Sequence, residues 1–265
     1  MKILRFIDEN GAVCLGTDSD GNTATAVVET PSGAYEITGE KQTIRKILPP
    51  VSPAAVFCIG LNYRGHAVET GMALPEYPVV FMKNPASVIG HRENVVLPQS
   101  CRETPQVDYE AELAVVIGRA AKNVEAENAM DYVKGFTVAN DISARVWQKK
   151  GGGGQWVRGK SFDTFCPLGP VLVTCDGIDD PSNLDISLSL NGRVMQQSNT
   201  SDMIFSVARL IAFLSEDTTL AAGTVILTGT PEGVGFTRTP PVYLNPGDLL
   251  ETTIETIGTL ENRVV

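Results

Sequence analysis

Two acidic residues stand two positions apart where an apolar run begins. Glu110 and Glu112 lead into residues 113–117, Leu-Ala-Val-Val-Ile, which read as a buried strand. Because side chains alternate along a strand, both carboxylates point to the same face. Like charges this close repel each other unless a cation holds them, so the pair predicts a divalent metal site. A solvent-exposed polar face at the start of the strand is the alternative.

A third carboxylate follows a second apolar stretch. Asp141 comes after residues 135–140, at the expected junction between a strand and a short helix from Ile142. Asp141 could serve there simply as a helix N-cap. As a third oxygen ligand, without a nearby His or Cys, it favours Mg²⁺ or Mn²⁺ over zinc. The same helix would place Arg145 and Gln148, three residues apart, on one face.

The chain has only two histidines, His66 and His91, as candidates for imidazole chemistry. Glu69 lies three residues after His66, so one helical turn would bring the two side chains into contact. A carboxylate on one ring nitrogen fixes the tautomer and makes the other nitrogen a better base. A surface histidine in a polar loop is the alternative. His91 lies in an expected turn, with no link to the carboxylates.

Residues 154–161 match the phosphate-loop pattern G-x-x-x-x-G-K-[ST]. That motif needs a buried strand before it and a helix after it. The preceding residues are polar, and the prolines within residues 162–170 cannot extend a helix. We therefore expect no nucleotide site, which leaves Lys160 available for another role.

The elements that must position these residues are mostly short strands. Asn191-Gly192 predicts a tight hairpin turn. Beyond the short helix from Ile142, helices are expected at residues 125–134 and 203–214, with one or two helical turns at 43–48. The expected strands cover residues 2–7, 12–15, 24–29, 55–60, 79–83, 107–117, 135–138, 171–174, 185–190, 193–197, 224–228 and 249–257.

Strands and helices do not alternate regularly, so a doubly wound α/β sheet is not expected. The fold class is α+β and mostly β. We predict a small N-terminal β domain over residues 1–48 and a larger catalytic domain over residues 49–265.

Composition excludes several classes of protein. Lys plus Arg is 21 and Asp plus Glu is 31 in 265 residues, giving a net charge of −10. This balance argues against nucleic-acid binding and against a polybasic membrane anchor. The absence of a long apolar run predicts no transmembrane helix, and the early acidic residues do not fit a signal peptide. Five widely spaced cysteines indicate a reduced, intracellular protein, cytoplasmic or in an organelle.

Six motifs together carry a resemblance over about residues 50–265. They are Gly60-Leu-Asn-Tyr with His66-x-x-Glu69, Phe81-Met-Lys83-Asn-Pro, Asp108-Tyr-Glu110-Ala-Glu112-Leu, Asn140-Asp141-Ile-Ser-Ala-Arg145, Gly159-Lys160-Ser-Phe-Asp and Thr228-Gly-Thr230-Pro-Glu-Gly-Val-Gly. Their order resembles the fumarylacetoacetate hydrolase family. Within that family, the sequence resembles the short branch of acylpyruvase, oxaloacetate tautomerase-like and hydroxyheptadienedioate isomerase-like proteins.

The resemblance implies a mixed β-sandwich roll that forms a homodimer, and a lid over residues 62–78. It implies Mg²⁺ or Mn²⁺ held by Glu110, Glu112 and Asp141. It assigns catalytic roles to His66, Glu69 and Lys160. It assigns substrate contacts to Tyr63, Arg145, Gln148, Thr230 and Lys83. Where the parent hydrolase has a further acidic ligand before its histidine, residues 56–59 here are apolar. The resemblance therefore assigns three metal ligands to this sequence rather than four. This difference makes fumarylacetoacetate itself a weaker candidate substrate than a smaller 2-oxo acid.

The implied partner is a small 2-oxo acid that chelates the cation, which stabilises an enolate as a Lewis acid. Water attack on a distal carbonyl would give C–C bond hydrolysis of an acylpyruvate, which is our first expectation. Loss of a carboxylate would give oxaloacetate decarboxylation. Reprotonation would give oxaloacetate tautomerisation or 2-hydroxyhepta-2,4-diene-1,7-dioate isomerisation. A non-catalytic binding protein with this fold is the remaining alternative.

Overall fold

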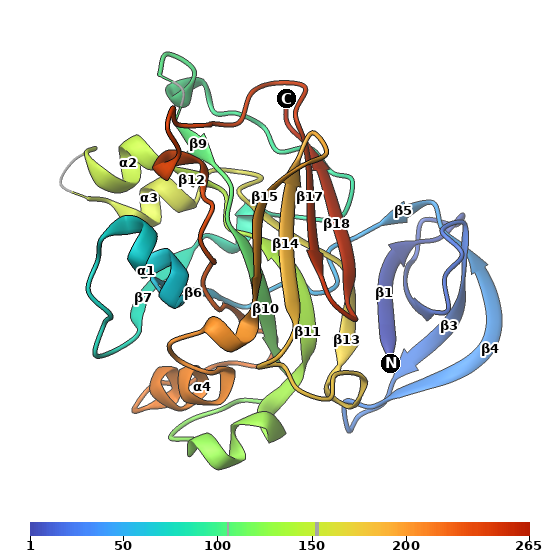
Figure 1. The fold of residues 1–265 in the computed structure, drawn as a ribbon. Coiled ribbons are helices and arrows are strands. Elements are labelled where there is room, and N and C mark those ends of the chain that lie inside the picture. The colour runs from blue at the N-terminus through green and yellow to red at the C-terminus, as the bar shows by residue number, and fades with distance from the viewer. Residues whose placement is uncertain (105, 152–153) are drawn as a thin grey trace.

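The N-terminal strands form one end of a long twisted sheet. The computed structural model describes residues 1–104, 106–151 and 154–265. The first strands pair in the order β4-β3-β2-β1, and β5 also pairs with β1. Figure 1 shows them, in blue, to one side of the rest of the chain. Their bounds are β1 Lys2–Ile7, β2 Val13–Thr17, β3 Thr23–Glu29, β4 Tyr35–Thr43 and β5 Lys46–Ile47.

The sheet continues from β1 into the strands that carry the acidic residues. Its order onward is β13-β11-β10-β16-β6-β7, and β8 pairs with β13. A separate four-stranded sheet has the order β15-β14-β17-β18, and β9 pairs with β12. The bounds are β6 Val56–Gly60, β7 Val79–Lys83, β8 Val88–Ile89, β9 Val107–Asp108, β10 Ala111–Ile117, β11 Val133–Asn140, β12 Ser143–Ala144, β13 Cys166–Thr174, β14 Asp185–Leu190, β15 Arg193–Asn199, β16 Val225–Leu227, β17 Leu249–Ile254 and β18 Gly258–Arg263.

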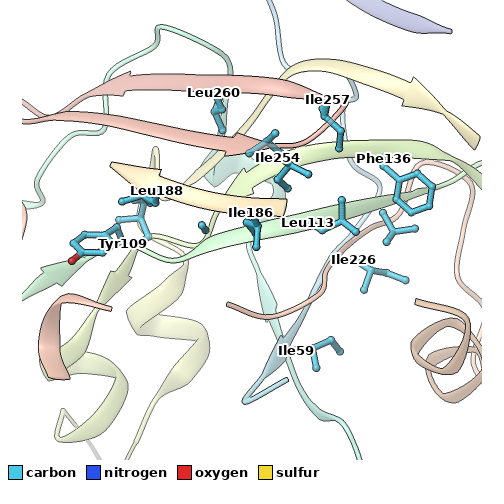
Figure 2. Packing of buried hydrophobic residues seen from close by; sticks show 14 of the residues in the cluster. Ile59, Tyr109, Leu113, Phe136, Ile186, Leu188, Ile226, Ile254, Ile257 and Leu260 are labelled. Carbon is cyan, nitrogen blue, oxygen red and sulfur yellow. The ribbon is translucent and has the colours of Figure 1, made fainter. Parts of the chain in front are cut away.

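The main core fills the space between the two sheets. Leu113 of β10 and Phe136 of β11 pack with Ile186 of β14 and Ile254 of β17, as Figure 2 shows. On the other face of β10, Ala114 and Val116 belong to a second buried cluster. Because both faces of β10 are covered, every residue of this strand is buried. Its Leu-Ala-Val-Val-Ile run is the sequence that such a strand requires.

Helices are short and lie at the margins of the sheets. In Figure 1, α1, α2 and α3 group on the side opposite the N-terminal strands. Their bounds are α1 Arg64–Thr70, α2 Arg145–Lys149, α3 Trp156–Lys160 and α4 Val207–Ser215. The 3₁₀ helices cover Pro85–Ser87, Gln99–Cys101, Ala126–Tyr132, Cys175–Gly177, Thr200–Asp202 and Gly235–Thr237. Among the described residues, no helix has the length and apolar character needed to span a membrane.

The mostly β class is confirmed, and the predicted helices need correction. The helical turns expected at 43–48 are wrong, because Lys46 and Ile47 pair with β1 as a strand. The helix expected at 125–134 is a 3₁₀ helix that covers Ala126–Tyr132, and β11 begins at the next residue, Val133. The helix expected at 203–214 starts later, at Val207, because the Ser206 hydroxyl accepts a bond from the Arg209 N–H.

Candidate active site

A cavity of about 240 Å³ lies between the three short helices and the acidic end of β10. One wall is apolar and includes Ile59, Phe81 and Trp156. The other wall carries charged and polar groups. Those groups are His66, Thr70, Glu110, Glu112, Arg145, Gln148, Lys149, Lys160 and Thr230. Most of the side chains predicted from sequence to do chemistry therefore share one small cavity.

The three predicted metal ligands come together. Each of Glu110, Glu112 and Asp141 has a carboxylate oxygen, and these oxygens lie within 4.8 Å of one another. Strand pairing explains this, because Ala111 of β10 is opposite Asn140 of β11. The Asp141 N–H donates to the Glu110 carbonyl at 2.8 Å and holds the two strand ends together. All three residues are buried, so the alternative of a solvated polar face is wrong.

Buried cations neutralise part of this acidic cluster. Lys160 Nζ lies 2.6 Å from Glu110 Oε2 and 2.6 Å from Asp141 Oδ2. Lys83 Nζ lies 2.5 Å from Asp141 Oδ1, and Arg145 Nη1 lies 2.7 Å from Glu110 Oε1. Burial alone would raise the pKa of Glu110, but Lys160 and Arg145 outweigh it and hold that pKa well below its ordinary value.

Glu112 is the carboxylate that these cations leave uncompensated. Among the described residues no cation pairs with it, and its Oε2 accepts the Gly229 N–H at 2.6 Å. The pKa of Glu112 is raised well above its ordinary value, mainly because the carboxyl is buried and also because Asp141 and Glu110 repel its charge. Three converging carboxylates, one of them without a paired cation, offer hard oxygen donors that fit a divalent cation such as Mg²⁺ or Mn²⁺.

Close packing of α3 on α2 places Lys160 in the cavity. A Cβ on Gly159 would lie 2.7 Å from the backbone nitrogen of Gln148, so a larger residue there would push the helices apart. Lys160 is 1% exposed, and its Nζ lies 5.1 Å from the centre of the Phe81 ring. The Gly-Lys pair therefore serves helix packing and the positioning of a buried ammonium.

His66 reaches the same cavity from α1. Its Nδ1 lies 3.1 Å from Glu69 Oε2, one turn along the helix, as the spacing predicts. Glu69 Oε1 accepts bonds from the Gly233 N–H at 2.9 Å and the Thr237 hydroxyl at 2.8 Å. Burial opposes ionisation of Glu69, but the bonds from His66, Thr237 and Gly233 lower its pKa. With Nδ1 engaged, Nε2 is the nitrogen available for proton transfer.

Asp108 is a site residue to which the sequence reasoning gave no role. It is fully buried and accepts the Arg145 Nε–H at 2.8 Å. It also accepts the N–H groups of Gly235 and Phe236 at 2.8 and 3.1 Å. Arg145 Nη1 in turn donates to Gln148 Oε1 at 3.0 Å, on the helix face that the spacing predicted. A carboxylate two residues before Glu110 was the available sequence signal.

Two predicted substrate ligands lie outside the cavity lining. Lys83 lies behind Asp141, where its Nζ also donates to the Ile142 carbonyl at 3.1 Å. Tyr63 is fully buried at the start of α1, and its hydroxyl has no hydrogen-bond partner among the described residues. Thr230 does line the cavity, and its Oγ1 accepts a bond from Gln196 Nε2 at 2.8 Å.

The segment predicted to form a lid, residues 62–78, contains α1. Within residues 62–78, the Asn62 amide donates to the carbonyls of Phe205 and Thr228 at 3.0 and 2.7 Å. The Gly65 N–H donates to Asp202 Oδ2 at 2.8 Å. The run of four glycines at 151–154 also predicts a flexible stretch, but Gly152 and Gly153 lie outside the described residues.

Residues 55–265 match the family model described as fumarylacetoacetate (FAA) hydrolase C-terminal. The mitochondrial oxaloacetate tautomerase Fahd2a of Rattus norvegicus is 45% identical over 245 residues, which are 92% of this chain and 77% of the relative.

Two solved structures match along the whole chain. The 5-carboxymethyl-2-hydroxymuconate delta-isomerase of Mycobacterium smegmatis has a TM-score of 0.86 and 38% identity, covering 100% of this chain and 99% of that one. The 2-hydroxyhepta-2,4-diene-1,7-dioate isomerase of Mycobacterium marinum has a TM-score of 0.85 and 37% identity, covering 100% and 98%. The sequence matches and the shared mixed β-sandwich roll show that this chain belongs to the fumarylacetoacetate hydrolase family.

Proposed function

We propose that this protein is a divalent-metal-dependent enzyme that tautomerises oxaloacetate or a related small 2-oxo acid. The observation that carries the proposal is the shared cavity, which is lined by Glu110 and Glu112 of the acidic cluster and by His66, while Asp141 and Glu69 contact these residues from behind the lining. Similarity to a relative named oxaloacetate tautomerase and to two isomerases supports proton transfer over bond cleavage. We therefore prefer tautomerisation to our first expectation, the C–C bond hydrolysis of an acylpyruvate.

Glu110, Glu112 and Asp141 are the residues that would hold the cation. When bound there, Mg²⁺ or Mn²⁺ would supply Lewis-acid stabilisation of negative charge on the substrate's 2-oxo oxygen. Lys160 and Arg145 place two further positive charges in the same wall of the cavity, where that charge develops. These groups make the carbon next to the carbonyl more acidic.

His66 is the proposed proton carrier. Its Nε2 would remove a proton from the carbon next to the 2-oxo group, and the electron pair of that C–H bond would form the enolate double bond. The same proton would then pass to the enolate oxygen and complete the enol. Glu69 holds the imidazole in the tautomer that leaves Nε2 unprotonated. Gln148 and Thr230 are proposed to orient the substrate by hydrogen bonds. Lys83 and Tyr63 would act indirectly, by supporting Asp141 and the start of α1.

A substrate panel tests the proposal. Oxaloacetate, acetylpyruvate and fumarylpyruvate are each followed by ultraviolet absorbance with Mg²⁺ present, and the products are identified by NMR. We expect fast keto–enol interconversion of oxaloacetate, with no release of carbon dioxide beyond the uncatalysed rate. Faster cleavage of either acylpyruvate than interconversion of oxaloacetate would instead assign the cavity to C–C bond hydrolysis.

A further inference from the structure

One cation in the cavity wall has no carboxylate partner. Lys149 is the last residue of α2 and lines the cavity together with Arg145. In the part of the chain that the structure describes, no acidic side chain forms an ion pair with it. Its Nζ lies 3.3 Å from the centre of the Phe236 ring, in a cation–π contact.

The other cations of the cavity wall are already engaged. Lys160 bridges Glu110 and Asp141, and Arg145 pairs with Asp108 and Glu110. Burial and the nearby charge of Arg145 both lower the pKa of Lys149. The carboxylates of Asp108 and Glu110 also attract the Lys149 ammonium, but neither forms an ion pair with it. Lys149 is exposed to solvent, so an anion entering the cavity can reach a cation that has no paired acidic side chain among the described residues.

We infer that Lys149 binds a second carboxylate of the substrate, remote from the 2-oxo acid group, and so selects dicarboxylic 2-oxo acids. This inference rests on the proposed function, which places the 2-oxo acid end at Glu110, Glu112 and Asp141. The carbon chain between the two anionic ends would lie along the apolar wall that includes Ile59 and Phe81. Phe236, which also lies 4.5 Å below the Arg145 guanidinium, fixes the position of both cations.

A matched pair of substrates isolates the contribution of the second carboxylate to substrate binding. Oxaloacetate and its 4-methyl ester share the 2-oxo acid end, and the ester lacks only the distal charge. Steady-state kinetics with Mg²⁺ compares wild type with Lys149→Met and Lys149→Arg. Lys150→Met is the matched control, because Lys150 is exposed like Lys149, which it follows in the chain, but does not line the cavity.

We expect Lys149→Met to raise KM for oxaloacetate about tenfold, equivalent to about 1.4 kcal/mol, with KM for the ester changed by less than about twofold. Lys149→Arg should retain most of the preference for the diacid, and Lys150→Met should behave as wild type. Inhibition by oxalate, which has no distal group, should be the same in all four proteins. If Lys149→Met raises KM equally for oxaloacetate and for the ester, or raises it for neither, the assignment is overturned.

A binding measurement separates this inference from the proposed function. The same two compounds are titrated with Mg²⁺ while the melting temperature is recorded. If wild type interconverts neither compound, the proposed function fails. The Lys149 assignment still stands if Lys149→Met reduces stabilisation by oxaloacetate and leaves stabilisation by the ester unchanged, and it is overturned if both change alike.

Discussion

The carboxylate of Asp108 and the guanidinium of Arg145 form a buried ion pair across 37 positions of sequence, with Nε 2.8 Å from Oδ2. Asp108 belongs to β9 and Arg145 begins α2, directly after β12. The pairing of Ser143 with Asp108 in the short β9–β12 ladder brings them together. This pair fixes the guanidinium that faces the cavity.

Asp108→Asn should lower the free energy of unfolding by about 3 kcal/mol, because Arg145 would stay buried with one charged partner fewer. It should also raise KM for oxaloacetate, since the guanidinium would be free to turn. Urea unfolding and steady-state kinetics check the two effects. Asp131→Asn, at an exposed position, is the control and should change stability by less than about 0.5 kcal/mol. Equal stability of Asp108→Asn and wild type would show that the pair has no structural role.

Glu112→Gln should stabilise the metal-free protein at neutral pH and abolish its stabilisation by Mg²⁺. The raised pKa of Glu112 means that the folded state binds its proton more tightly than the unfolded state. This contribution to stability is complete below the ordinary value of 4.5 and is lost as pH rises through the raised pKa.

With chelator present, the melting temperature of Glu112→Gln should therefore exceed that of wild type by about 3 °C or more near pH 8. The difference should shrink toward pH 5. With Mg²⁺ in place of chelator, wild type should gain stability and the variant should not. A variant that melts below wild type at every pH without metal would contradict the account of an uncompensated carboxylate.

His66→Ala should reduce kcat by about 10²–10⁴-fold, the usual cost of losing a general base. Glu69→Gln should reduce kcat by a smaller factor, because the imidazole stays in place and only its charged partner is lost. Rates of oxaloacetate interconversion measure both changes, and oxalate binding with Mg²⁺ should persist in each. His91→Ala is the control, since His91 Nδ1 accepts the Glu261 N–H at 3.1 Å and does not line the cavity. An inactive His91→Ala beside an active His66→Ala would mean that the active site lies elsewhere.

Oxalate with Mg²⁺ should slow amide hydrogen exchange across residues 62–78. The lid prediction rests on α1, which Glu69 fastens to the Gly233–Thr237 loop through two hydrogen bonds. A ligand that contacts His66 adds a further restraint on the same helix. Exchange mass spectrometry compares free and bound protein, with β10 as an internal reference that is buried in both. Identical exchange of 62–78 in the two states would argue against a lid.

Local sequence patterns were enough to predict the bounds of several strands and one tight turn. Strands Lys2–Ile7, Val79–Lys83 and Asp185–Leu190 were predicted with the bounds that the structure has. The hairpin at Asn191-Gly192 follows from two residues with positive φ, of 53° and 77°. The pattern failed at residues 43–48, where pairing with β1 decides the structure. It also missed β4, whose side chains are mostly exposed and show no alternation.

The closeness of Glu110 to Glu112 and the contact of His66 with Glu69 could be predicted because strand alternation and helical spacing are local rules. The roles of Asp108 and Lys149 could not, because each depends on a partner brought close by the fold: Arg145 for the first and Phe236 for the second. The division at residue 48 and the homodimer stay predictions.

Metal dependence of oxaloacetate interconversion tests the central claim most directly. The protein is stripped with EDTA, the chelator is removed, and the conversion of enol to keto oxaloacetate is followed by absorbance before and after Mg²⁺ or Mn²⁺ is added. Our account predicts that stripped protein shows only the uncatalysed rate and that either cation restores catalysis in wild type but not in Glu112→Gln. Full activity after exhaustive chelation would contradict it.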